Sequence, residues 1–484
     1  MTIFYQTESK KRNMDRFDYT YIFSDIRSVS TCLKVIDYRS SKTSKIGVFV
    51  NDYQLLRRDC VLAEIADLID LAVAVHVADR LSIRKGEIPC HIHIVLPLRY
   101  PRNIDHPHIM QCLVDTLYWY TGDHWCFEFK QRIALGRPAE LQACLPWMNT
   151  SFEPTEVALW SGGLDSLAGL FTRLSADTAT HYTLIGTGSN SIIQHTQSQV
   201  AQVVREIVPN RTKLVQLPIC LEETADLPKN SSQRSRGFVF LLLGAATSLI
   251  EKQDTLYVYE NGIGAINLPF RMSEVGLDHA RSVHPRSLLK MSTLVSQLLD
   301  MPFKFRNPFL FWTKAQMCEA LVQDNTVDLI FDTISCDRLH REKPMQCGYC
   351  SSCLLRRQAL AVLGVEDKTP YVATHGTRPR TLDSSHLRAM LYQVDKLRVV
   401  LNAPEPWQAF SARYYQVTEL YQTTQYDGTT PEQRRNQLLQ LYERYVKEWD
   451  VVQDTVGREL LDDEVHVPLR STTTGYQQEQ LAWK

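Results

Sequence analysis

The chain has 484 residues, 44% of them hydrophobic, and its 53 Lys and Arg residues nearly balance 54 Asp and Glu residues, leaving a net charge of −1. This length is typical of about three structural units, and the balanced charge gives no global field toward nucleic acid or a membrane. The 20 Gly and 21 Pro residues are too few for a collagen-like or low-complexity chain. The 12 cysteines are unusual, and their spacing must decide between disulfides, metal ligands and buried thiols.

The start of the chain, MTIFYQTESKKRNMDR, lacks the basic and apolar regions of a secretory signal. The two most apolar stretches, 68–77 and 238–250, are shorter than the ~20 residues that cross a bilayer, and we predict that both are buried helices. We therefore expect a cytoplasmic protein without membrane contact, in which a tight cysteine cluster binds metal rather than forming disulfides.

Residues 1–150 have the pattern of an N-terminal α+β unit. Strands are predicted at 46–50, 91–96 and 125–129, and helices at 62–81 and 109–120. No motif in this unit indicates a particular chemistry.

Residues 151–369 have the alternation of short apolar strands and helices that is typical of a parallel sheet covered by helices. The predicted strands are 157–160, 182–186, 213–217 and 256–259, and the predicted crossover helices begin near Leu164, Ile192 and Gln233. The expected fold class is therefore α/β.

Residues 370–484 are predicted to form a helical unit. Thr430, Pro431 and Gln433 suit the N-cap, N1 and N3 positions of a helix. An apolar stripe at helical spacing follows, and packing is its expected role: Leu438, Leu441, Tyr442, Tyr445, Trp449 and Val452. Asp383 and Ser384 are predicted to begin another helix that runs to about residue 400.

The sharpest motif is the SGGLDS loop, residues 161–166, which stands between a predicted strand and a predicted helix. Gly162 and Gly163 let the backbone approach an anion, and the N-terminus of the following helix attracts phosphate oxygens. The Ser161 and Ser166 hydroxyls add donors, whereas Asp165 suits loop ordering or Mg²⁺ binding. The alternative is an ordinary turn and helix cap; a Walker A sequence is absent.

The SGGLDS loop resembles the PP-loop of the ATP pyrophosphatase superfamily. The resemblance implies a PP-loop (HUP-like) sheet and an enzyme that attacks the α-phosphate of ATP, adenylates an oxygen nucleophile and releases pyrophosphate.

Four cysteines cluster near residue 350, at Cys336, Cys347, Cys350 and Cys353. Successive CxxC steps can wrap around one ion, and four thiolates give the closed tetrahedral shell of structural zinc. An iron–sulfur cluster is the alternative, although the fourth cysteine and proline of a ferredoxin run are missing. His340 lies between the ligands and is predicted to take no part.

The SGGLDS loop followed by SC…CGYCSSCLLRRQA, which begins at Ser335, resembles 7-cyano-7-deazaguanine synthases, the QueC family of PP-loop enzymes. The similarity extends to the segment 233–238, to Asn307 with Pro308, and to Thr313 with Lys314. It implies ATP, Mg²⁺ and one Zn²⁺ as cofactors and 7-carboxy-7-deazaguanine as substrate. In that family ammonia attacks the adenylated carboxylate to give an amide and finally a nitrile.

The segment 260–269, together with Arg281, His284 and Pro285, resembles QueC-like proteins of anti-phage systems of the Qat and type IV CBASS types. The segment 186–190 and the two flanking units depart from the housekeeping pattern. This resemblance implies a ligase that joins the activated deazaguanine to the N-terminal amine of a partner protein from the same operon. No residue pattern indicates nucleic-acid binding.

The resemblance and the local chemistry together assign candidate residues. The predicted catalytic residues are Asp165, Ser166 and Arg236. The predicted ATP-binding residues are Ser161, Gly162, Gly163, Leu164, Asp165, Ser166 and Lys314. The predicted substrate-binding residues are Arg234, Glu260, Asn261, Asn267, Arg281 and His284, with Glu260 accepting the paired N–H donors of a guanine-like ring. For Arg234, Arg236, Lys314 and His284, ordinary surface or capping roles explain the sequence equally well.

Three alternatives stay open for the function. The acceptor is either a protein amine or ammonia, in which case the chain is a free nitrile synthase. A tRNA-thiolating PP-loop enzyme needs a reactive cysteine, for which Cys220 is the candidate. A silent scaffold would bind ATP or partners without releasing AMP.

Overall fold

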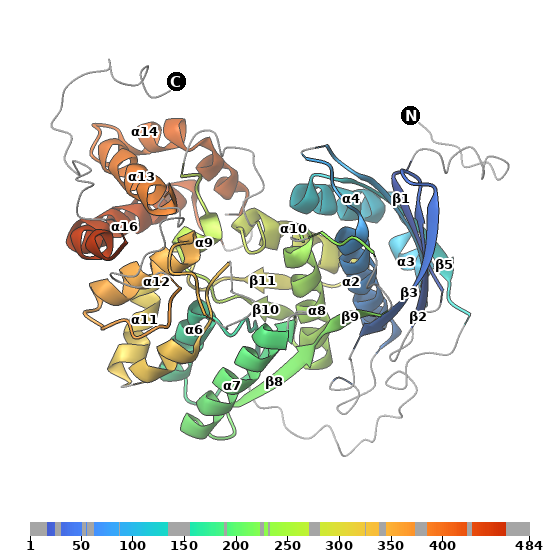
Figure 1. Ribbon diagram of the computed structural model, residues 1–484, viewed down its shortest axis with the longest axis horizontal. Coiled ribbons are helices and arrows are strands. Elements are labelled where there is room, and N and C mark those ends of the chain that lie inside the picture. The colour runs from blue at the N-terminus through green and yellow to red at the C-terminus, as the bar shows by residue number, and fades with distance from the viewer. Residues whose placement is uncertain are drawn as a thin grey trace.

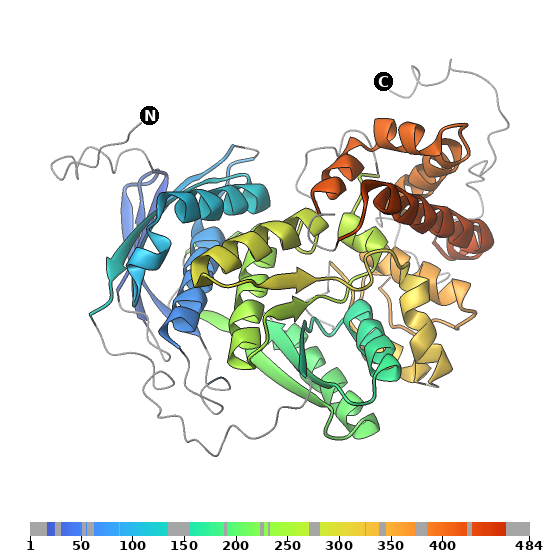
Figure 2. The same ribbon diagram turned by 180° about the vertical axis from the view of Figure 1, so that it is seen from behind.

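The computed structural model describes residues 17–24, 31–50, 55, 62–86, 88–133, 155–187, 191–222, 227–230, 233–270, 281–324, 326–337, 345–372, 385–423 and 428–460. A parallel sheet occupies the middle of the molecule, between an N-terminal sheet and a group of C-terminal helices (Figures 1 and 2). The predicted helix start at Asp383 and Ser384, His340 and residues 188–190 lie outside the described residues.

The N-terminal sheet has six strands in the order β5-β4-β1-β2-β3-β9. Their bounds are β1 (Tyr19–Phe23), β2 (Thr31–Asp37), β3 (Lys42–Val50), β4 (His91–Leu98), β5 (His124–Gln131) and β9 (Ile219–Glu222). The edge strand β9 comes from the middle of the chain, directly after β8 of the core sheet, and pairs antiparallel with β3. The N-terminal sheet is thus completed by a segment distant in sequence.

The helices of this region are α2 (Ala63–Leu81), α3 (Pro101–Ile104) and α4 (Pro107–Thr121). Apolar side chains occupy nearly the whole circumference of α2, which is buried between the N-terminal sheet and α8. The apolar stretches 68–77 and 238–250 are accordingly confirmed as buried helices. Among the described residues, no helix combines the length and apolarity needed to span a membrane.

The core sheet has five parallel strands in the order β11-β10-β6-β7-β8, which confirms the predicted parallel α/β sheet. Their bounds are β6 (Thr155–Leu159), β7 (His181–Thr187), β8 (Thr212–Leu217), β10 (Thr255–Tyr257) and β11 (Lys304–Arg306). Adjacent residues of a strand face opposite sides. Val157 packs with α8 and α10, and Ala158 packs with α6 and α7.

The helices of the core are α6 (Leu164–Ala176), α7 (Ser191–Ile207), α8 (Arg236–Ile250), α9 (Gly262–Ile266), α10 (Pro285–Leu299), α11 (Lys314–Gln323), η4 (Val327–Asp332) and α12 (Ser351–Val362). Helix α8 lies between the core sheet and α2, so one continuous hydrophobic core joins the N-terminal sheet to the core sheet. This shared core therefore supports both sheets.

The C-terminal helices are α13 (Ser385–Leu401), α14 (Pro406–Arg413), η5 (Tyr415–Thr423) and α16 (Pro431–Leu460). The predicted capping box is confirmed, because Gln433 N donates to Thr430 Oγ1 at 3.2 Å and Thr430 N donates to Gln433 Oε1 at 2.9 Å. The apolar stripe of α16 is buried and packs against α12 and α13, as predicted.

Three details differ from the sequence predictions. The strands β1, β2, β9 and β11 were not predicted, although the other strands were. Strand β10 ends at Tyr257 rather than at residue 259, although Val258 N still donates to the Arg306 carbonyl of β11 at 2.8 Å. Helix α8 begins at Arg236 rather than near Gln233, because Ser235 is its N-cap.

Candidate functional site

The SGGLDS loop follows β6 at the carboxyl edge of the core sheet and leads directly into α6. Open α/β sheets bind their ligands at this edge. Gly162 has a φ of 74°, and a Cβ there would lie 3.1 Å from the Gln197 backbone N, so both its conformation and its surroundings require glycine. The backbone of the loop at Gly162 therefore packs directly against the backbone of α7.

The two serines of the loop face each other across its turn. The Ser161 and Ser166 hydroxyl oxygens are 2.9 Å apart, and Gly163 N donates to Ser161 Oγ at 3.1 Å. Gly163 is the N-cap of α6 and has no side chain to accept the amides of the first turn. This N-terminus suits an anion because its amides and the helix dipole favour negative charge.

Asp165 lies at the centre of a polar cluster that joins three strand ends. Lys314 Nζ, at the start of α11, forms an ion pair with Asp165 Oδ2, and Asn261 Nδ2 donates to Asp165 Oδ1 at 3.0 Å. Lys314 is buried. Burial opposes its charge, but the carboxylates of Asp165 and Glu260 prevail and raise its pKa.

Glu260 follows β10 and lies beside Asp165. Asn261 Nδ2 also donates to Glu260 Oε1 at 2.9 Å, and Asn307 Nδ2 holds the Glu260 backbone carbonyl at 2.8 Å. Burial, followed by the charge of Asp165, raises the pKa of Glu260 to about 8, although Lys314 opposes the shift. A Cβ at Gly264 would lie 2.5 Å from Glu260 Oε1, so a side chain there would displace the Glu260 carboxylate.

Asn261 is a bridging residue of this cluster. Besides the two carboxylates that it binds through Nδ2, its Oδ1 accepts Gly264 N at 2.9 Å and caps α9. Asn267 closes the same short helix in the left-handed region, with a φ of 48°. The structure thus brings Asp165, Glu260, Asn261 and Lys314 together, and gives Asn267 a C-capping position nearby.

The segment before the first cluster cysteine supports the SGGLDS loop, a role that the sequence did not predict. Leu164 N donates to Ser335 Oγ at 3.1 Å, and Ile334 N donates to the Gly162 carbonyl at 3.2 Å. Gln346 holds this segment through two further bonds, because its Oε1 accepts Ser335 N at 2.9 Å and its Nε2 donates to the Thr333 carbonyl at 3.0 Å.

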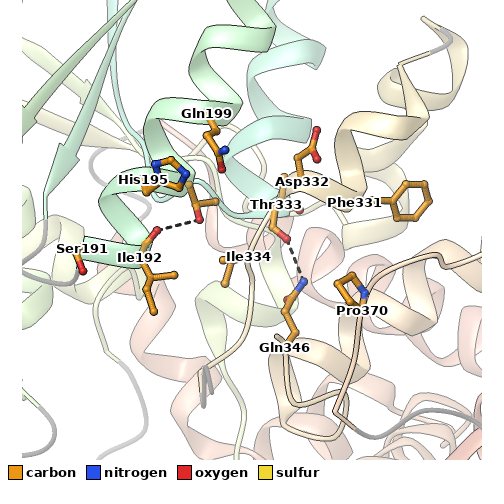
Figure 3. Close-up of a pocket in the computed structure, with 11 residues that line it drawn as sticks. Ser191, Ile192, His195, Gln199, Phe331, Asp332, Thr333, Ile334, Gln346 and Pro370 are labelled. Carbon is orange, nitrogen blue, oxygen red and sulfur yellow. Dashed lines mark hydrogen bonds between the residues drawn. The ribbon is translucent and has the colours of Figure 1, made fainter. Parts of the chain in front are cut away.

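A cavity of about 440 Å³ lies between the first turns of α7 and this segment (Figure 3). Its lining combines His195 and Gln199 of α7 with the opposite group of Phe331, Asp332 and Thr333. Ile334 and Gln346 border the cavity and also hold the SGGLDS loop or its support. A molecule in this cavity would therefore contact residues that support the SGGLDS loop.

The four cluster cysteines lie together, with their sulfur atoms all within 4.8 Å of one another. The sulfurs of Cys347 and Cys353 are 3.9 Å apart. Zn–S bonds of about 2.3 Å place tetrahedral sulfurs about 3.8 Å apart, so the spacing suits a single ion. An iron–sulfur cluster would place several iron and sulfide atoms between the thiolates and so require a wider spacing.

Backbone amides point at two of these sulfurs, as suits metal-bound thiolates. Cys347 N donates to Cys336 Sγ at 3.2 Å, and Cys350 N donates to Cys347 Sγ at 3.3 Å. Cys350 is also the N-cap of α12. The cluster could hold zinc, and it would tie the Ser335 segment to α12.

The two arginines at the start of α8 have different surroundings. Arg234 Nη1 donates to the Thr121 carbonyl at the end of α4, in the N-terminal unit, at 3.0 Å. Arg236 is exposed, with its guanidinium carbon 4.9 Å from the Phe240 ring centre, and it interacts electrostatically with Asp337 beside the cysteine cluster. Arg236 thus lies toward the cysteine cluster, whereas the described hydrogen bond of Arg234 is structural.

Arg281 and His284 lie at the start of α10 and contact α4. Arg281 Nη1 donates to the Trp119 carbonyl at 2.7 Å, and the guanidinium groups of Arg281 and Arg286 lie 4.2 and 4.4 Å from the Trp119 ring centre. His284 is buried, its Nδ1 accepts Arg286 N at 3.2 Å, and burial lowers its pKa to about 3. The described contacts of Arg281 and His284 are thus with the N-terminal unit and within α10, not with the SGGLDS loop.

The fold and the site together define a parallel α/β protein with a glycine-containing loop at the carboxyl edge of its sheet and a four-cysteine element joined to that loop. Residues 281–364 match the model of a family described as Queuosine biosynthesis protein QueC. The match runs from α10 through the cysteine cluster to α12, and the SGGLDS loop and Glu260 lie before it. This part of the chain is QueC-like. No curated protein matches the chain.

Proposed function

We propose that this protein is an ATP-dependent enzyme that adenylates the carboxylate of a 7-deazaguanine and then joins it to an amine. The observation that carries the proposal is the bond between Leu164 N and Ser335 Oγ. It links the SGGLDS loop, which resembles a PP-loop, to the cysteine element of the QueC-like segment. Each motif alone would suit several chemistries, whereas the two in one site suit the QueC reaction.

The first step forms a bond between a carboxylate oxygen of the substrate and the α-phosphorus of ATP, and pyrophosphate leaves. The amides of Asp165 and Ser166, in the first turn of α6, and the Ser161 and Ser166 hydroxyls would hold the pyrophosphate oxygens. Asp165 would hold Mg²⁺, which when bound neutralises phosphate charge. Lys314 fixes the orientation of Asp165 and adds positive charge beside the loop.

In the second step a neutral amine attacks the carbonyl carbon of the acyl adenylate, AMP leaves, and the new amide loses a proton. Holding the amine close to the carbonyl carbon in the orientation for attack supplies much of the rate of this step. Glu260 would accept two N–H donors from the edge of the deazaguanine, because its carboxylate adjoins Asp165 and has one hydrogen bond described for its side-chain oxygens. Arg236 would bind an anionic group of a ligand.

For the acceptor we favour the N-terminal amine of a partner protein over ammonia, in an anti-phage setting. The support is the resemblance of the segment 260–269 and the two flanking units, which provide surface beyond the site. A thiolating reaction is disfavoured because Cys220 lies on β9 of the N-terminal sheet, opposite Phe49.

The test is mass spectrometry of the purified protein with ATP, Mg²⁺ and 7-carboxy-7-deazaguanine, with either ammonia or the proteins encoded beside it. We expect AMP, pyrophosphate and a mass increase on one partner protein. A nitrile without any protein adduct would select the free synthase. No AMP with any acceptor would refute the adenylation itself.

A further inference from the structure

The start of α8 is capped by a carboxylate from another part of the chain. Ser235, the N-cap of α8, makes no side-chain capping bond of its own. Its backbone N and its hydroxyl instead both donate to Asp79 Oδ2 of helix α2, at 2.9 and 2.8 Å. Because Asp79 is completely buried, this contact is shielded from water and fixes the first turn of α8 against the N-terminal unit.

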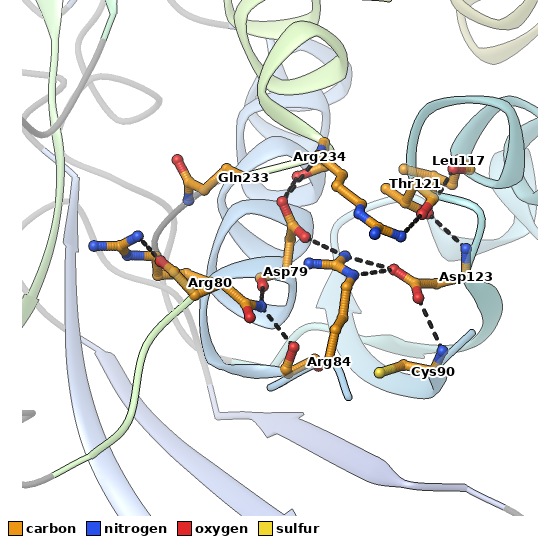
Figure 4. Close-up of polar contacts among 12 residues, drawn as sticks. Asp79, Arg80, Arg84, Cys90, Leu117, Thr121, Asp123, Gln233 and Arg234 are labelled. Atoms are coloured by element: carbon orange, nitrogen blue, oxygen red, sulfur yellow. Dashed lines mark hydrogen bonds and ion pairs between the residues drawn. The ribbon is translucent and has the colours of Figure 1, made fainter. Parts of the chain in front are cut away.

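Asp79 belongs to a buried group of two carboxylates and one arginine (Figure 4). Arg84 Nη2 lies 2.5 Å from both Asp79 Oδ1 and Asp123 Oδ2, and Asp123 Oδ1 accepts Cys90 N at 2.8 Å. We call Asp79, Arg84 and Asp123 the α8 anchor. The planar guanidinium donates to both carboxylates at once, and this fixes the positions of the three side chains relative to one another.

The residues on either side of Ser235 are two arginines with different surroundings. Arg234, one residue before Ser235, donates back to the Thr121 carbonyl within the N-terminal unit. Arg236, one residue after Ser235, is exposed and interacts with Asp337, which in turn interacts electrostatically with Glu260. Ser235 is therefore flanked by one arginine that bonds to the N-terminal unit and by one whose charge acts on Asp337, beside the candidate site.

We propose that Asp79 is a positioning residue that, together with Arg84 and Asp123, holds Arg236 in place to bind a planar oxyanion in the candidate site. Arginine suits a carboxylate or a phosphate because its fork donates two parallel hydrogen bonds. The proposal rests on the proposed function and deepens it: the N-terminal unit completes the site by fixing a residue of the core. The oxyanion belongs to either the deazaguanine carboxylate or ATP.

The central test compares Asp79→Asn with Asp67→Asn. Asp67 is a matched control on the same helix, because it is also buried but binds Arg99, with Oδ1 3.0 Å from Arg99 Nη1, away from α8. In the full-length protein, we expect Asp79→Asn to raise KM at least about tenfold for one of the two ligands and to change kcat less, while Asp67→Asn leaves both KM values unchanged. The ligand affected identifies the oxyanion.

A double-mutant cycle connects the effect to Arg236. If Asp79 acts through Arg236, then adding Asp79→Asn to Arg236→Gln raises the same KM no further. Additive effects, or equal effects of Asp79→Asn and Asp67→Asn, would overturn the proposal. Should Asp79→Asn not fold, Ser235→Ala removes one hydrogen bond to Asp79 and should produce a smaller change in the same KM. An unchanged KM in that variant would overturn it as well.

Direct binding separates this proposal from the proposed function. Calorimetry of ATP and of 7-carboxy-7-deazaguanine with the same variants should give the same ranking of dissociation constants without turnover. A wild-type protein that binds these ligands but forms no AMP would refute the adenylation and leave the ranking measurable. Equal dissociation constants for wild type and Asp79→Asn would refute the positioning role alone.

Discussion

The candidate site and the α8 anchor each contain two carboxylates and one cation, but the charges are arranged differently. In the anchor, the Arg84 guanidinium contacts both Asp79 and Asp123 at 2.5 Å. In the site, the Lys314 ammonium forms its described ion pair with Asp165, while the pKa of neighbouring Glu260 is raised to about 8.

This difference separates a structural charge group from one prepared for a ligand. A buried group in which every carboxylate already receives a cation and hydrogen-bond donors gains little from a further partner, and removing its cation leaves uncompensated charge. A carboxylate that burial holds in its neutral form gains when a ligand supplies donors, and such perturbed groups concentrate at functional sites. The comparison predicts that changes in the site reduce turnover or ligand binding and that changes in the junctions mainly reduce stability.

The largest effect is expected at the cysteine cluster, which belongs to both categories. Cys347→Ser removes one of four ligands, so we expect loss of zinc, loss of much of the about 10 kcal/mol that a structural zinc can contribute, and a fall in AMP formation of at least ~100-fold. Metal analysis and thermal unfolding check this. Cys126→Ser, a partly buried thiol on β5, should retain the zinc. Full zinc occupancy in Cys347→Ser would contradict the assignment.

Next comes Asp165→Asn, which should lower kcat for AMP release by ~10²–10³ because the loop loses its metal-binding carboxylate and Lys314 loses its ion pair. Zinc content should not change, since the cysteines are untouched. Glu156→Gln is the matched control: Glu156 lies at the start of β6, the strand that precedes the loop, and pairs with Arg173 at 2.6 Å. It should reduce stability and leave turnover near wild type. AMP release at the wild-type rate in Asp165→Asn would exclude the proposed role of the loop.

A smaller effect concerns pH and Glu260. Burial and the charge of Asp165 raise its pKa to about 8, whereas a ligand with two N–H donors favours the ionised form. Binding should therefore release a proton below pH 8, so deazaguanine affinity should rise by up to about tenfold per unit from pH 6 to 8 and then level off. Calorimetry in buffers of different ionisation enthalpy measures the proton. A Glu260→Gln variant with the same steep pH dependence would show that another group titrates.

The same shift has a consequence for stability. The pKa of Glu260 is higher in the folded protein than its ordinary value of 4.5, so the folded state binds more protons between these values. The contribution of Glu260 to stability is thus present below about pH 4.5 and is lost as the pH rises through about 8. Glu260→Gln should remove this slope, which chemical unfolding at several pH values would detect.

The sequence predicted the parts of the molecule that depend on local patterns. The glycines and serines of the SGGLDS loop and the spacing of the four cysteines are short-range signals, and the parallel strands show as apolar runs between helices. Strand β9 has four residues and pairs with a strand far away in the chain, so no local pattern marked it. Ser335 was part of the QueC-like motif, but its bond to the SGGLDS loop was not predicted because it joins segments far apart in the chain.

The sequence indicates the α8 anchor only in part. Asp67, Asp70, His76 and Asp79 interrupt an otherwise apolar helix, which indicates buried polar pairs, but the sequence does not say which partners they take. Likewise, Arg234 and Arg236 are residues of the same type in one short segment, so the sequence does not distinguish their roles. Only tertiary structure separates them, because Asp79 fixes the register of the turn between them.

The smallest effect is expected where α16 meets the core. Glu448 accepts Thr313 Oγ1 at 2.6 Å and Gln358 Nε2 at 2.9 Å, so it joins α16 to the residue before Lys314 and to α12. Glu448→Gln would place an NH₂ group against one donor, and we expect a loss of about 1–2 kcal/mol in unfolding free energy. Glu443→Gln, on the exposed side of α16, should change nothing. If Glu448→Gln instead lowered kcat without a loss of stability, the C-terminal helices would belong with the site rather than with the junctions, and the division drawn between the two kinds of charge group would not hold at this end of the molecule.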